Sequence, residues 1–135
     1  MASSLLYNRS NSFIISIMTA KLTTHVLDTY HGKPASGVSW TLELEEPGGN
    51  WYQISAGLTN EDGRSSEAII TGEAIITGTY RLTFDIAGYF SRMGVQLSEP
   101  PFLGKVVIQV NLVEGEGYHV PLLCSPWSYS TYRGS

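Results

Sequence analysis

Histidine is the residue type best suited to acid–base chemistry near neutral pH, and this chain has three. His25 lies in KLTTHVLD and His119 in YHVPLL, both of which have the composition of strands, whereas His31 lies in a turn. Alternate side chains of a strand share a face, so His25 is expected beside Thr23 and Leu27. Position alone leaves two interpretations open for His25 and His119, a packed histidine or a catalytic one. It predicts that His31 lies at the surface.

The sequence lacks the common motifs of catalytic and metal sites. It contains no G-x-S-x-G elbow, no P-loop, no H-E-x-x-H and no close set of His, Asp and Glu at metal spacing. Cys124 is the single cysteine, which excludes an intrachain disulfide. Its neighbours Leu122, Leu123 and Pro126 predict a buried, protonated and inert thiol.

The last eighteen residues, YHVPLLCSPWSYSTYRGS, are unusually aromatic for a chain terminus. Chain ends are usually frayed because few contacts hold their backbone. This one combines tyrosines, a tryptophan and an arginine and ends abruptly. We therefore expect the C-terminal segment to be docked on the domain and to form part of a working site.

The segments that must position these residues alternate with the period of β-strands. In GVSWTLELEE, GTYRLTFDI and GKVVIQVNLV every second residue is apolar, and NWYQISAGLT follows a PGG turn. IAGYFSRMG breaks this pattern and predicts about two helical turns before SEPPF, because a residue preceding proline avoids the α region. The chain is therefore predicted to be an all-β sandwich with one short helix.

Length and charge limit the domains and partners. The 135 residues suit a single domain, and a net charge of −4 argues against nucleic acid or anionic lipid as a partner. FIISIM, near the N-terminus, is too short to cross a bilayer, so we expect no membrane partner. We divide the chain into an N-terminal extension (1–20), disordered or targeting, and a domain (21–135). A cytoplasmic location is expected, and peroxisomal or other organellar targeting by the extension stays open.

Four segments together resemble the transthyretin-related 5-hydroxyisourate hydrolases: LTTHVLDTYHGKPASGV at 22–38, TNEDGR at 59–64, GTYRLTFD at 78–85 and the C-terminal segment at 118–135. The closing YRGS resembles the signature that separates these hydrolases from transthyretin, whose terminus is longer. The resemblance implies a transthyretin-like β-sandwich of two four-stranded sheets with one short helix. It also implies a homotetramer in which two subunits line each channel.

The resemblance further implies a reaction, the hydrolysis of 5-hydroxyisourate to 2-oxo-4-hydroxy-4-carboxy-5-ureidoimidazoline without a metal or organic cofactor. The catalytic residues that it implies are His25, Arg64 and His119, and the substrate-binding residues are His25, Arg64, Tyr132, Arg133, Gly134 and Ser135. Attack of water on a ring carbonyl requires a base and a group that stabilises the oxygen's negative charge. The two histidines and the arginine can supply both, and the cation would keep a nearby imidazole neutral. Which histidine is the base stays open.

The sequence departs from the family pattern at one position near His119. Members of the family commonly read HYHVPLL, and Gly117 replaces the first of these histidines, so local packing or the pH response of the site is expected to differ. Two other functions are alternatives to the hydrolase. The same fold also suits a non-catalytic carrier that binds a small hydrophobic ligand in the tetramer channel. His25, His119 and YRGS favour the hydrolase, because a carrier's channel needs no group that activates water. A structural adhesion domain would more naturally carry disulfides.

Overall fold

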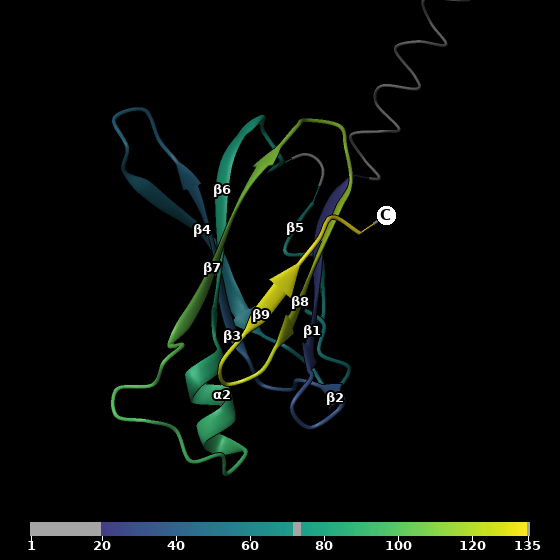
Figure 1. Cartoon of the computed structure of the whole chain (residues 1–135). Coiled ribbons are helices and arrows are strands. Elements are labelled where there is room, and N and C mark those ends of the chain that lie inside the picture. Colours follow the sequence, from purple (N-terminus) through teal and green to yellow (C-terminus); the bar gives the residue numbers. More distant parts are fainter. Residues whose placement is uncertain (1–19, 72–73, 135) are drawn as a thin grey trace, which may run out of the picture.

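A computed structural model of the chain describes residues 20–71 and 74–134. Two β-sheets face each other, and a short helix lies at one end of the sandwich (Figure 1). The predicted N-terminal extension, apart from Ala20, lies outside the described residues, and so does Ser135. The fold confirms the predicted all-β sandwich.

The first sheet has the strand order β2-β1-β8-β9, with β5 also paired to β1. Its strands are β1 (Lys21–Asp28), β2 (Lys33–Pro34), β5 (Ile70–Thr71), β8 (Tyr118–Cys124) and β9 (Tyr129–Thr131). β1 and β8 run parallel, whereas the other pairs are antiparallel. The sheet has five strands rather than four because the two-residue strands β2 and β5 pair with opposite ends of β1.

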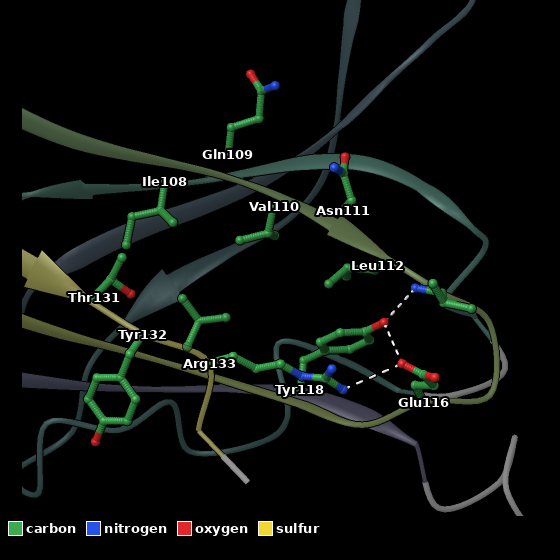
Figure 2. A pocket seen from close by; sticks show the side chains of 12 residues that line it. Ile108, Gln109, Val110, Asn111, Leu112, Glu116, Tyr118, Thr131, Tyr132 and Arg133 are labelled. Carbon is green, nitrogen blue, oxygen red and sulfur yellow. Dashed lines mark hydrogen bonds and ion pairs between the residues drawn. The ribbon is translucent and has the colours of Figure 1, made fainter.

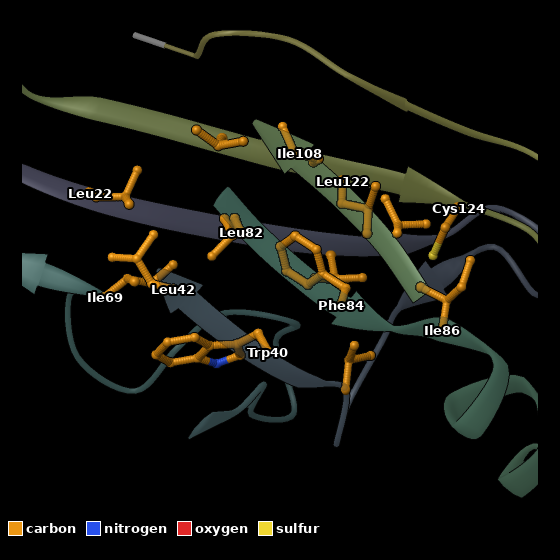
Figure 3. Close-up of a cluster of buried hydrophobic side chains, with 14 of the residues drawn as sticks. Leu22, Trp40, Leu42, Ile69, Leu82, Phe84, Ile86, Ile108, Leu122 and Cys124 are labelled. Atoms are coloured by element: carbon orange, nitrogen blue, oxygen red, sulfur yellow. The ribbon is translucent and has the colours of Figure 1, made fainter. Parts of the chain in front are cut away.

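The second sheet is antiparallel and has the order β4-β3-β6-β7. Its strands are β3 (Ser39–Glu45), β4 (Trp51–Leu58), β6 (Gly78–Asp85) and β7 (Lys105–Leu112), at the segments predicted from alternation. The inward side chains of both sheets form one apolar core, which includes Leu22, Leu42, Leu82, Phe84 and Leu122 (Figure 3). Their alternate neighbours point outward, so β1, β6 and β7 each have one buried and one wetter face.

The predicted short helix is α2 (Ile86–Arg92). Asp85 caps its N-terminus, because the carboxylate accepts a hydrogen bond of 3.1 Å from the backbone N–H of Gly88. The helix ends before the prolines of SEPPF. Gly94 has a φ of 83° and donates its N–H to the carbonyl of Ser91, which closes the last turn as a C-terminal glycine commonly does.

Candidate active site

The parallel pairing of β1 with β8 brings the two candidate histidines to the outer face of the first sheet. Thr23 is the register partner of His119, and His25 is the partner of Pro121. The buried residues of β1 are Leu22, Thr24, Val26 and Asp28. The side chains between them, including His25, therefore point away from the core. Both histidines are half-buried, and neither belongs to the apolar cluster.

A tight loop over residues 60–64 places Arg64 beside these histidines. The side-chain oxygen of Asn60 accepts hydrogen bonds from the backbone N–H groups of Asp62 and Arg64, at 2.9 and 3.1 Å. Gly63 has a φ of 77°, and a Cβ there would collide with the carbonyl oxygen of Val26. The N-E-D-G-R segment therefore needs its asparagine and glycine to form the turn.

His25 is tied to the same loop. Its Nε2 donates a hydrogen bond of 2.9 Å to the backbone carbonyl of Asp62, and its backbone forms an isolated antiparallel bridge with Arg64. A carbonyl oxygen only accepts, so Nε2 carries the proton in this contact. His25 thus holds the loop that carries Arg64.

His119 is held on two sides. Its Nδ1 lies 2.8 Å from the hydroxyl oxygen of Thr23. The backbone N–H of Gly134 donates a bond of 2.7 Å to the carbonyl oxygen of His119. A Cβ at position 134 would lie only 2.7 Å from Cδ2 of the imidazole, so the third residue of YRGS must be glycine for the ring to keep this position.

A cavity of about 460 Å³ adjoins these side chains, and its lining consists of Lys21, Thr23, Thr24, Arg64, Ser65 and His119. Two of these described residues are cationic and none is a carboxylic acid. Such a lining suits a molecule that carries carbonyl oxygens or negative charge. His25 does not line this cavity and lies next to it through the bridge to Arg64.

The environment of His119 favours its neutral form. Burial lowers the pKa of the imidazole below its usual value, and the positive charges of Arg64 and His25 lower it further. The direction agrees with the prediction that a nearby arginine keeps an imidazole neutral. A neutral His119 is able to accept a proton near pH 7.

Residues of the C-terminal segment lie beside two different cavities. Gly134 lies against His119, but Tyr132 and Arg133 line a second cavity of about 490 Å³ between β7, β8 and β9 (Figure 2). The guanidinium of Arg133 lies 4.3 Å from the ring centroid of Tyr118 and donates to the carboxylate of Glu116, at 3.4 Å. Arg133 therefore points away from the cavity beside His119. The predicted role of Ser135 lies outside the described residues.

Gly117 has room for a side chain. A Cβ there would meet only backbone atoms of Lys21, at 3.8 and 4.0 Å, which is ordinary contact. The replacement of the expected histidine therefore removes a side chain beside Lys21 and leaves no steric reason for glycine.

His31 and Cys124 do not line the cavity beside His119. His31 is exposed as predicted, yet its Nδ1 donates to the fully buried carboxylate of Asp28, at 2.6 Å, and Tyr89 donates to the same carboxylate. Cys124 is buried, and burial, together with the nearby charge of Asp28, raises the pKa of its thiol to about 12. The predicted burial of this thiol is confirmed.

Sequence reasoning did not single out Thr23, Lys21 or Ser65. Thr23 and His119 are 96 positions apart, and only the β1–β8 register brings them together. Within residues 20–71 and 74–134, no three His, Cys, Asp or Glu side chains are grouped so that they could hold a metal ion. The described part of the chain also has no helix that is both long and apolar enough to span a membrane.

Comparison with known proteins places this chain in a family. The HIUase/Transthyretin family matches residues 22–134. The chain belongs to the HIUase/Transthyretin family. A member from Pseudomonas aeruginosa, named 5-hydroxyisourate hydrolase, is 46% identical over 117 residues, which are 85% of this chain and 91% of that protein. The predicted family is therefore confirmed, and the prediction of a hydrolase is supported.

Solved structures of similar proteins have the same fold as this chain. Transthyretin from Sparus aurata has a TM-score of 0.77 and 30% identity, and the match covers 85% of this chain and 97% of that one. A crystal structure of (S)-allantoin synthase has a TM-score of 0.80 and 38% identity. That match covers 86% of this chain and 44% of the allantoin synthase chain. The transthyretin-like fold is thus confirmed.

Proposed function

We propose that this chain hydrolyses 5-hydroxyisourate in the breakdown of urate. The observation that carries the proposal is that Arg64 and His119, from distant segments, line one cavity. The name of the Pseudomonas aeruginosa relative supports the substrate, and the name of the allantoin synthase supports the same area of purine chemistry. The product is 2-oxo-4-hydroxy-4-carboxy-5-ureidoimidazoline.

His119 acts as the general base in the proposed mechanism. It removes a proton from a water molecule whose oxygen attacks a ring carbonyl, and its depressed pKa keeps it neutral for that task. The carbon–nitrogen bond of the ring then breaks, and the leaving nitrogen takes up the proton that His119 removed from water. Arg64 binds the substrate's carbonyl oxygens through paired N–H donors and stabilises the negative charge that develops on the attacked carbonyl.

His25 acts mainly through Arg64. Its Nε2 is occupied by the carbonyl of Asp62, and its side chain does not line the cavity, so it is less suited than His119 to accept the proton of water. It holds the loop that carries Arg64, and its positive charge, when present, opposes protonation of His119. The positions of Tyr132 and Arg133 do not support direct contact with a substrate in the cavity of the same subunit.

We also propose that the active protein is a homotetramer. β7 and β9 are edge strands of the two sheets, and the lining of the apolar cavity between them includes the exposed side chains of Val113 and Tyr132. Unpaired strand edges next to exposed apolar side chains favour association with a second copy. Sedimentation equilibrium over a range of concentrations would give the mass of four chains, and a monomer at micromolar concentration would contradict this.

The function is tested with matched arginine variants. Arg64→Gln should lower kcat/KM for 5-hydroxyisourate by about 10²-fold or more, because it removes the charge that stabilises the transition state. Arg81→Gln is the control: Arg81 pairs with Glu43 on the second sheet, so its loss should leave activity within about twofold of the parent. Equal activity of the parent and Arg64→Gln would contradict the role of Arg64.

A non-catalytic carrier is the competing function, since transthyretin shares the fold. The cavity beside His119 argues against it, because Lys21, Arg64 and His119 are ionisable. A carrier would bind a hydrophobic ligand and leave the decay of 5-hydroxyisourate unchanged.

A further inference from the structure

Thr23 makes a side-chain contact that the proposed reaction does not yet explain. Its hydroxyl oxygen lies 2.8 Å from Nδ1 of His119, and both side chains line the 460 Å³ cavity. Because Nδ1 is occupied by this contact, Nε2 is the ring nitrogen left for a molecule in the cavity. Within residues 20–71 and 74–134, Nε2 of His119 has no hydrogen-bond partner.

A neutral imidazole carries its proton on one nitrogen only, so the direction of the Thr23 bond decides what Nε2 can do. If the hydroxyl donates to Nδ1, the proton sits on Nε2, and that nitrogen cannot act as a base. If the hydroxyl accepts from Nδ1–H, Nε2 keeps its lone pair. The same contact therefore either permits or blocks base catalysis.

The charges around the ring favour the second arrangement. Arg64 and Lys21 line the cavity, His25 lies close enough to influence His119, and no carboxylic acid is among the lining residues. A lone pair directed at these cations is stabilised, whereas an N–H directed at them is opposed. Thr23 is uncharged, so the proton is better placed on Nδ1.

The contact with Thr23 fixes which way the imidazole ring of His119 faces. The imidazole edge at Cδ2 packs so closely on Gly134 that a Cβ there would lie 2.7 Å away. A half-turn of the ring would place Nδ1 against Gly134 and a carbon atom against the Thr23 hydroxyl, and the hydrogen bond would be lost.

We propose that Thr23 is a positioning residue that accepts a hydrogen bond from Nδ1–H of His119 and holds the tautomer whose Nε2 lone pair is available in the cavity. The inference rests on the proposed function, in which His119 is the base. It adds a residue from β1 to the site and assigns the atom of His119 that removes the proton from water.

Thr23→Val tests this proposal because valine keeps the branched shape and removes the hydroxyl. We expect kcat to fall about 10-fold to 100-fold, as for other partners that orient a catalytic histidine, with KM within about twofold. Thr23→Ser should restore most of the activity. Thr79→Val is the matched control, since its hydroxyl bonds Asn111 on the other sheet and its loss should not affect turnover.

The pH profile gives a readout that simple loss of packing would not produce. An acceptor at Nδ1 stabilises the imidazolium, so its removal in Thr23→Val should move the acid limb of kcat/KM to lower pH. A shift to higher pH would mean that the hydroxyl donates, and it would overturn the proposal, as would an unchanged profile with full activity.

Nitrogen-15 NMR of the parent protein without substrate separates this proposal from the proposed function. The expected result is a proton on Nδ1 of His119 and none on Nε2, with protonated Nε2 gaining population in Thr23→Val. A parent with the proton on Nε2 would overturn the role of Thr23 even if the protein were active. A parent with the expected tautomer but no hydrolysis would overturn the proposed function instead.

Discussion

Gly134→Ala should uncouple activity from folding, because the new methyl group would strike the proposed base. Its Cβ would lie 2.7 Å from Cδ2 of His119, which is 0.7 Å less than the 3.4 Å at which ordinary contact begins. Either the imidazole or the chain end must therefore move by most of an ångström. A displacement on the order of 1 Å at a reacting group costs about 10²-fold in rate, so kcat/KM should fall by roughly that factor.

The fold should tolerate the same change. The backbone hydrogen bond from Gly134 to the carbonyl oxygen of His119 contributes about 1 kcal/mol, so its loss should lower the melting temperature by no more than about 4 °C. Gly104→Ala is the control, because a Cβ there meets nothing within 4 Å. The assay is the decay of freshly made 5-hydroxyisourate. Activity of Gly134→Ala within twofold of the parent would refute the steric reasoning.

The remaining predictions concern charge and burial. Arg64→Gln should move the acid limb of kcat/KM to higher pH, because the lost positive charge no longer lowers the pKa of His119; an unmoved limb would contradict this coupling. Asp28→Asn should lower the free energy of unfolding in urea by about 2 kcal/mol, since it places an amide among hydrogen-bond donors. Burial alone would raise the pKa of Asp28, but bonds from His31 and Tyr89 outweigh it and lower that pKa. This contribution is full above the unfolded pKa and is lost as the pH falls through the folded one, so the difference between parent and variant should begin to shrink below about pH 4 and vanish only below the lowered pKa of Asp28. Cys124 should stay unreactive toward a disulfide reagent at pH 8 until the protein unfolds, because its thiol pKa is about 12.

The sandwich was largely predictable because its strands follow simple alternation. The buried residues Trp40, Leu42, Leu82 and Phe84 recur at every second position, as a strand with one buried face requires. The helix was visible as a break in this pattern. The predicted length of about two turns matches Ile86–Arg92, and Gly94, with its positive φ, closes the last turn before the prolines are reached.

The site was predictable only in part. His25, Arg64 and His119 were selected through family resemblance, and the structure brings them together through β1, β8 and the loop at residues 60–64. Thr23 could not be selected, because a parallel pairing between segments 96 positions apart leaves no local pattern. Nor does sequence show that Arg133 turns toward Tyr118, since that direction depends on packing at the edge of the sheet.

The proposed hydrolysis can be measured from the absorbance of freshly generated 5-hydroxyisourate, followed with the full chain and with its His119→Ala variant. We expect the parent to accelerate the decay strongly and the variant to lose about 10²-fold or more of this acceleration. A decay that is unchanged by the parent protein would show that this chain does not hydrolyse 5-hydroxyisourate.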